Sequence, residues 1–166
     1  RYKLYDPEGN EVDINLDELY NDENNIKEAL DSILNQSYQD LEVICINDGS
    51  TDNSKKIIES YRNKFKKLKL INQKNQGSGI ARNNGIKIAQ GEYISFLDAD
   101  DIYVDHDALE IMYNIAKDTN ANMVSANLKG ITVNGEFVNN DNLTRFKKQT
   151  TISPEEYEIL RYDGIL

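Results

Sequence analysis

The hexapeptide Phe96-Leu97-Asp98-Ala99-Asp100-Asp101 decides how the rest of the sequence is interpreted. A mostly apolar run over residues 92–97 predicts a strand, and three carboxylates follow within four residues. Like charges so close together raise one another's pKa, and a bound divalent cation is the usual relief. Alternatively, the acids begin the next helix, where negative charge suits the helix dipole. The hexapeptide therefore predicts either a metal–diphosphate site at a strand end or a helix start.

Outward from this stretch, the alternation of elements sets the fold class. A hairpin and a half-exposed strand are expected within residues 1–20, and a second hairpin around Asn134-Gly135. Helices are predicted near residues 21–36, 53–65, 80–89 and 153–162 and from about Asp105 or Asp107, and strands over 41–46, 68–71, 92–97 and 122–128. This order predicts an α/β fold with a mostly parallel central sheet and helices on both faces.

Length and composition predict one soluble globular domain over residues 1–166, with residues 1–20 atypical. The net charge of −10 excludes nucleic acid as the expected partner. Cys45 lies in an apolar run and is expected to be a buried thiol, and His106 has no companions for a zinc site. The sequence contains no apolar stretch of the ~20 residues that a membrane span needs and no signal-peptide pattern, so a cytoplasmic location is expected.

Three polar loops are predicted at the carboxyl ends of strands, over residues 47–54, 74–82 and 98–101. Ligands of open parallel sheets bind at that edge. Asp48 can accept a hydrogen bond from a base or ribose, or the loop is a plain turn into a helix. Gly77 and Arg82 suit an anion at a helix N-terminus, or they belong to a flexible loop with a surface arginine. Because Arg82 occupies the third glycine position of a dinucleotide fingerprint, an NAD-dependent oxidoreductase is disfavoured.

Taken together, residues 20–127 resemble the family-2 glycosyltransferases, which are inverting, nucleotide-sugar-dependent enzymes of the GT-A fold. The resemblance rests on six pieces in order: YN at 20–21, ALDSILNQSY at 29–38, EVICINDGSTD at 42–52, NQG at 75–77, ARNNG at 81–85 and GEYISFLDADD at 91–101. It implies a GT-A-type, Rossmann-like three-layer sandwich.

The resemblance also implies how a nucleotide would be bound. Tyr20 would line the base pocket, and Asp48 would pair with the base, with uracil expected. Arg82 and the Gly77 loop would face the diphosphate, and Asp98 would contact the ribose. The expected donor is therefore a UDP-sugar.

By the same resemblance, Asp98-Ala99-Asp100 is similar to the family's DXD motif. Asp100 would bind Mn²⁺ or Mg²⁺, and Asp98 would help to orient the metal, while Asp101 is left to start the next turn. The implied partner beyond the donor is a carbohydrate or lipid-linked acceptor, as in cell-surface polysaccharide biosynthesis. Peripheral association with the inner face of the membrane is the alternative to a purely cytoplasmic location.

Two features depart from the family pattern. Positions 15, 17 and 18 are polar where the family has an apolar first strand, and no segment after residue 127 matches the family's catalytic base. The catalytic residue therefore stays unassigned, and the acceptor-side part is expected to be absent. The alternative function is a nucleotide-binding module without transferase activity.

Overall fold

The computed structural model describes residues 12–126, 130–132 and 137–138. The chain divides into two compact units, Arg1–Asn122 and Met123–Leu166, which are described separately. The expectation of a single domain remains a prediction. All the residues proposed for the site belong to the first unit.

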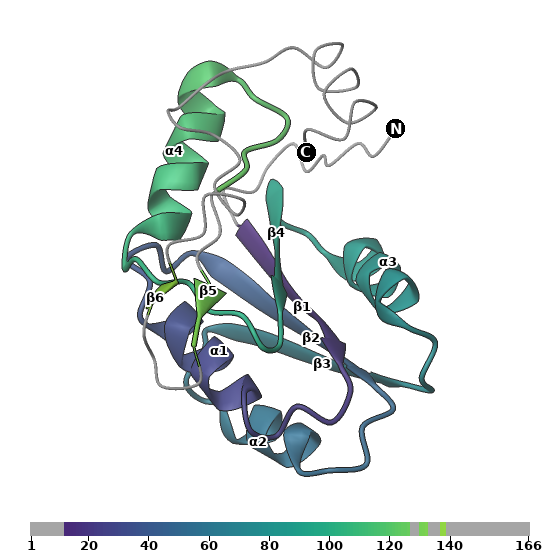
Figure 1. Cartoon of the computed structure of the whole chain (residues 1–166). Coiled ribbons are helices and arrows are strands. Elements are labelled where there is room, and N and C mark those ends of the chain that lie inside the picture. The colour runs from purple at the N-terminus through teal and green to yellow at the C-terminus, as the bar shows by residue number, and fades with distance from the viewer. Residues whose placement is uncertain (1–11, 127–129, 133–136, 139–166) are drawn as a thin grey trace, which may run out of the picture. The chain divides into compact units, whose positions relative to one another are not determined.

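A parallel sheet forms the centre of the first unit (Figure 1). Its strands are β1 (Val12–Leu19), β2 (Leu41–Asp48), β3 (Lys67–Gln73) and β4 (Tyr93–Asp98). They lie in the order β3-β2-β1-β4, and every neighbouring pair is parallel. Because the order reverses direction at β1, the crevice beyond the ends of β1 and β4 is the expected ligand position.

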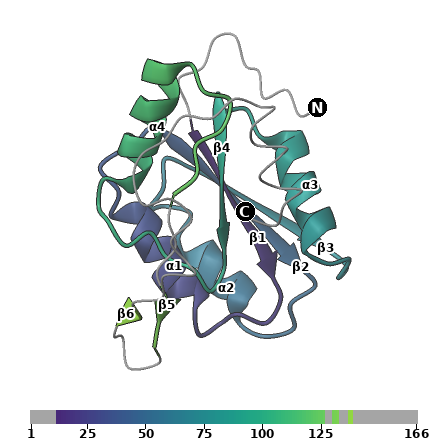
Figure 2. The same ribbon diagram turned by 45° about the horizontal axis from the view of Figure 1, so that its top comes forward.

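Helices cover both faces of this sheet (Figure 2). They are α1 (Ile26–Leu34), α2 (Ser54–Ser60), α3 (Ser78–Ile88) and α4 (Ala108–Thr119). Residues of α1, α2 and α4 share one buried cluster, whereas Ala81 of α3 packs in a second cluster on the opposite face. The predicted three-layer arrangement is therefore confirmed.

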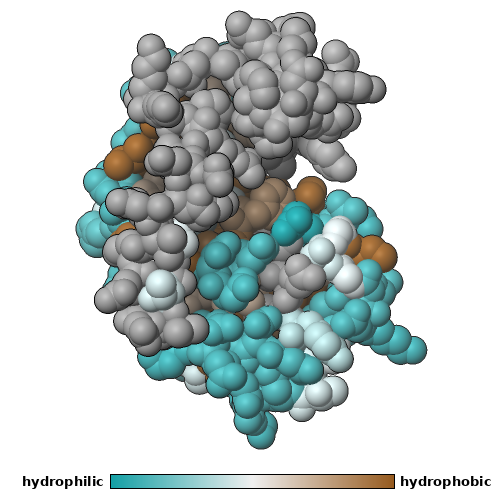
Figure 3. Space-filling model, viewed as in Figure 1, coloured by the Kyte–Doolittle hydropathy of each residue, from teal (hydrophilic) through white to brown (hydrophobic). Residues whose placement is uncertain are grey.

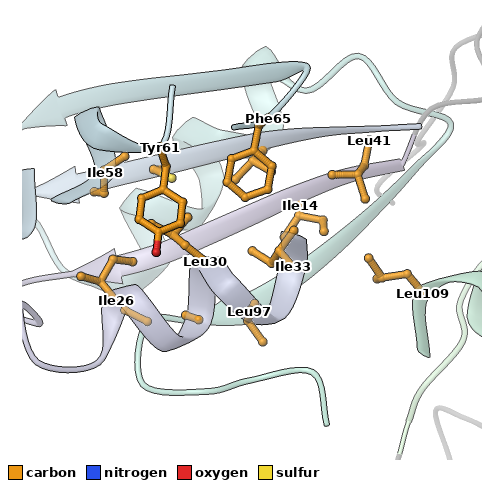
Figure 4. Close-up of a cluster of buried hydrophobic side chains, with 14 residues drawn as sticks. Ile14, Ile26, Leu30, Ile33, Leu41, Ile58, Tyr61, Phe65, Leu97 and Leu109 are labelled. Atoms are coloured by element: carbon orange, nitrogen blue, oxygen red, sulfur yellow. The ribbon is translucent and has the colours of Figure 1, made fainter. Parts of the chain in front are cut away.

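The side chains of β2 alternate between these two clusters. Val43 and Cys45 face the α1 side, and Ile44 and Ile46 face α3, in keeping with the two-residue period of a strand. All eight residues of β2 are buried, as expected for a strand covered on both faces. The larger cluster is shown in Figure 4, where side chains from α1, α2 and α4 meet those of the strands. Each fully buried aliphatic side chain contributes about 1.5–3 kcal/mol.

The strand predicted within residues 1–20 is present, but it lies inside the sheet rather than half-exposed. β1 is central, paired with β2 on one edge and β4 on the other, and Ile14 is fully buried. The register sets Ile14 opposite Val43 on one side and Ser95 on the other. Backbone pairing on two edges outweighs the low apolar content of the strand.

Three other boundaries differ from the predictions. α1 begins at Ile26, because residues 22–25 form a turn before it and Asn25 is the N-cap residue. α2 ends at Ser60, and Tyr61 and Phe65 are buried from the turns that follow rather than from the helix. A strand was predicted over residues 122–128; residues 122–126 do not form one, and residues 127–128 lie outside the described part.

The second unit contains a short antiparallel pair, β5 (Gly130–Ile131) and β6 (Phe137–Val138). This pair agrees with the hairpin predicted around Asn134-Gly135, although those two residues lie outside the described part. The predicted hairpin near the N-terminus and the predicted last helix also lie outside the described residues.

Candidate functional site

Three of the predicted site residues lie at one edge of the sheet. Asp48 and Asp98 are the last residues of β2 and β4, and Tyr20 directly follows β1. Since β1 lies between β2 and β4, the parallel register brings these ends together. Tyr20 is 48% exposed, so its ring is available at the surface. Hydrophilic residues dominate the lower part of the view in Figure 3, where the strand-end loops of Figure 1 lie.

The carboxylate of Asp48 organises the loop before α3. It is 1% exposed and accepts hydrogen bonds from the backbone N–H of Gln76 (2.9 Å) and of Gly77 (2.8 Å). The Gln73 amide nitrogen donates a third bond at 2.8 Å. A buried carboxylate with three donors is well satisfied, because ionised oxygens require such partners. The predicted loop at residues 74–82 is therefore held to the end of β2.

Two glycines in these loops adopt backbone angles that other residues avoid. Gly49 has φ of +82°, and a Cβ at this position would lie 2.8 Å from the backbone nitrogen of Asn75. Gly77, the N-cap residue of α3, has φ of +84°. Only glycine takes this region without strain, so both loops depend on it.

Arg82 extends from α3 to the acidic turn, defined here as residues 98–101. Its Nη2 donates to Asp98 Oδ1 at 3.0 Å, and its guanidinium lies 5.8 Å from the centre of the Phe96 ring. Both partners of the ion pair are partly exposed, with side-chain exposures of 39% and 44%. A pair this accessible contributes at most about 1 kcal/mol. It can therefore rearrange at little cost when an anion approaches.

Negative charge is crowded at this corner. Asp100 is exposed, and the backbone N–H of Asp101 donates to the carbonyl of Asp98, which closes the turn. Partial burial and then the charges of Asp100 and Asp98 raise the pKa of Asp101. Burial, with the charge of Asp100 next in size, also raises the pKa of Asp22. A divalent cation would relieve this repulsion.

Asp22 was not among the predicted site residues. It lies in the loop after β1, where the sequence analysis predicted only the start of a helix. The signal available in the sequence was its place directly after Tyr20-Asn21 at a strand end. Its electrostatic coupling to Asp100 could not be predicted, because it depends on β1 and β4 being neighbours.

The loop after β1 is fastened to the loop after β2 by several hydrogen bonds. Asn21 Oδ1 accepts from the backbone N–H of Thr51 at 2.9 Å, and Glu23 Oε2 accepts from both nitrogens of Asn53 at 2.8 Å. Asp52 accepts from the backbone N–H of Glu23 at 3.0 Å and from that of Ser54 at 3.0 Å. Asp52 therefore connects the two loops and also accepts from the first amide of α2, whose N-cap residue is Asn53.

The predicted residues thus form two contacting pairs, Asp48 with Gly77 and Arg82 with Asp98. α3 joins the pairs, because it begins after Gly77 and carries Arg82. Within the described residues, no group of three or more His, Cys, Asp or Glu side chains is arranged to hold a metal ion.

A shallow groove of about 380 Å³ lies elsewhere, between α1 and residues 102–106. It is lined by Asp31, Ser32 and Gln36 among others, and by none of the predicted site residues. In the part of the chain that the structure describes, no helix has the length and apolar character to cross a membrane.

Comparison with known proteins identifies the relatives of this chain. A poly(ribitol-phosphate) beta-glucosyltransferase from Bacillus spizizenii is 41% identical over 121 residues, which cover 70% of this chain and 19% of that protein. A cholesterol galactosyltransferase from Borreliella burgdorferi is 42% identical over 104 residues, covering 60% of this chain and 29% of that protein. The chain therefore spans less than a third of the length of either relative.

The fold has a counterpart among solved structures. The S. aureus TarS 1–349 structure in complex with UDP-GlcNAc matches with a TM-score of 0.61 and 31% identity, over 74% of this chain and 36% of that chain. This likeness confirms the predicted GT-A fold. The family model described as glycosyl transferase family 2 matches residues 19–163. By sequence and by fold, the chain belongs to glycosyl transferase family 2.

Proposed function

We propose that this chain is the donor-binding part of a glycosyltransferase, which transfers a sugar from a UDP-sugar to an acceptor hydroxyl with inversion. The observation that carries the proposal is the acidic turn with its partner Arg82, at the point where the sheet order reverses. A carboxylate cluster beside a guanidinium suits a diphosphate bound with a cation. The solved relative that holds UDP-GlcNAc supports UDP as the nucleotide.

The donor set of the acidic turn fits Mn²⁺ or Mg²⁺. Asp98 and Asp100 would hold the metal, and diphosphate oxygens would complete its coordination, as these hard cations prefer. Burial is the main cause of the raised pKa values of Asp22 and Asp101, and the charge of Asp100 raises both further. When bound, such a metal offsets the charge that develops on the leaving nucleoside diphosphate.

The protein's own residues would orient the donor. Tyr20 would line the base pocket, Asp98 would contact the ribose, and Arg82 would turn from Asp98 to the diphosphate. Asp48 would pair with the base. Its two oxygens already accept from the Gln73 amide, from the Gly77 N–H and, on both oxygens, from the Gln76 N–H, so an N–H of uracil would share or displace one of these donors. We assign no catalytic base.

We further propose a carbohydrate or lipid-linked acceptor at the cytoplasmic side of a membrane, as in cell-surface polysaccharide synthesis. The names of two relatives support this range of acceptors, since one is a poly(ribitol-phosphate) glucosyltransferase and the other a cholesterol galactosyltransferase.

Calorimetry with UDP, in Mn²⁺ or in EDTA, tests the donor site. We expect Mn²⁺ to tighten UDP binding about tenfold or more, equivalent to at least ~1.4 kcal/mol. Asp100→Ala should abolish this gain, whereas Asp118→Ala, which removes an exposed carboxylate on α4, should retain it. A UDP affinity that is the same in Mn²⁺ and in EDTA, or binding of NAD in place of UDP, would contradict the proposal.

The second candidate is a nucleotide-binding module without transferase activity. It requires only the donor-side residues, all of which belong to the first unit. A panel of UDP-sugars with simple sugar and lipid-linked acceptors separates the two functions, measured as glycosylated product by mass spectrometry. Product formation supports the transferase, and UDP binding without product supports the module.

A further inference from the structure

The end of α1 is bound to the segment that follows the acidic turn. Gln36 lies just beyond α1 and is 3% exposed. Its amide nitrogen donates to the carbonyl of Asp105 at 2.9 Å, and its amide oxygen accepts from the backbone N–H of Leu109 at 3.1 Å. One buried side chain therefore uses both ends of its carboxamide to connect parts of the chain about 70 residues apart.

Two neighbouring contacts reinforce this connection. The backbone N–H of Tyr103 donates to Ser32 Oγ at 3.2 Å, and that of Ser37 donates to the carbonyl of His106 at 2.8 Å. The Tyr103 hydroxyl also lies 2.7 Å from Ser95 Oγ on β4. Both ends of the acidic turn are thus fixed, one by β4 and the other by residues 103–109 held against α1.

From these contacts we propose that Gln36 is a positioning residue, which keeps the acidic turn in the shape that binds the metal–diphosphate of the donor. The inference rests on the proposed function. Mutual repulsion among Asp98, Asp100 and Asp101 tends to spread the turn, and anchored ends oppose that spreading. Carboxylates held in place in advance bind a cation more tightly, and loss of such supporting contacts typically weakens metal binding 10–100-fold.

Gln36→Met tests this, because methionine keeps the length of the side chain and removes the hydrogen bonds to Asp105 and Leu109, together with a longer one to the Ser32 carbonyl. Gln39→Met is the matched control, since the Gln39 amide donates to the carbonyls of Leu34 and Gln36 in its own segment. We expect Gln36→Met to weaken UDP binding 10–100-fold in Mn²⁺ and to leave UDP binding in EDTA unchanged. The control should match the wild-type chain in both buffers.

Gln36→Glu provides a graded variant if Gln36→Met folds poorly. Its carboxylate still accepts from Leu109 but cannot donate to Asp105, so an intermediate loss is expected in Mn²⁺. Amide hydrogen exchange of the ligand-free chain adds a readout without metal. Exchange over residues 99–109 should rise in both Gln36 variants, while β2 stays protected and the Gln39 variant does not change.

The outcomes separate the two proposals. If the wild-type chain shows no Mn²⁺-dependent UDP binding, the proposed function fails, and this inference fails with it. If the wild-type chain binds as expected but the Gln36 variants lose equal affinity with and without Mn²⁺, or lose none, only the positioning role is overturned. Unchanged exchange over residues 99–109 would overturn it as well.

Discussion

The crowded carboxylates of the acidic turn reduce the stability of the fold, and Asp101 shows this effect. Folding raises the pKa of Asp101 through burial and then through the charges of Asp100 and Asp98. The Asp101 carboxyl group therefore binds its proton more tightly in the folded chain than in the unfolded chain. As a result, the free energy of unfolding falls as the pH rises from about 3.9, the unfolded pKa, through the folded pKa. At neutral pH, the charge on Asp101 is destabilising.

Asp101→Asn should consequently stabilise the chain at pH 7. The gain should be less than about 1 kcal/mol, because the side chain is only partly buried and solvent screens its charge. Urea unfolding measures the change. The gain should shrink in 1 M NaCl and disappear at pH 3, where the wild-type carboxyl is protonated. A variant less stable at pH 7 would mean that the Asp101 carboxylate makes a net favourable contact.

For individual residues, the sequence predicts which of the proposed site residues lie near one another. The expectation that strand-end loops converge brings Asp48 near Gly77, and Arg82 near Asp98, as the structure places them. The sequence did not predict that Asp22 interacts electrostatically with Asp100, because this interaction depends on which strands are neighbours. The roles of these residues toward a nucleotide remain predictions.

Among elements, the turn after β2 depends most on backbone conformation. Gly49→Ala should destabilise the chain by about 1–3 kcal/mol, because a Cβ would strain the positive φ and lie 2.8 Å from the Asn75 nitrogen. Gly79→Ala is the matched control in α3, where a Cβ meets nothing within 4 Å. It should stabilise by up to about 1 kcal/mol. Equal effects of the two substitutions in urea unfolding would contradict this account.

The order of the described helices and strands over residues 12–119 follows from hydrophobic periodicity, whereas the central position of β1 does not. The apolar run of β2 was sufficient to predict a buried strand. β1 alternates apolar and polar residues in sequence, and its central position arises from partners on both edges. Such partners lie far along the chain, so a local pattern cannot reveal them.

For the whole molecule, the single cysteine reports on opening of the sheet. Cys45 is fully buried in β2, and burial raises its pKa to about 12. Ellman's reagent at pH 8 should react at least about 1,000-fold more slowly with the folded chain than with the chain in guanidinium, because the thiol must first be exposed. Rapid labelling of the folded chain would show that β2 opens locally. Labelling that slows when UDP and Mn²⁺ are added would link donor binding to the stability of the sheet.

The strand order also has a consequence for synthesis on the ribosome. β1, β2 and β3 emerge first and can pair with one another, but the free edge of β1 has no partner until residues 93–98 have left the exit tunnel. An unpaired edge can associate with other chains during this interval. Because β4 also carries the acidic turn, the nascent chain closes its exposed edge and completes its acidic corner in the same event.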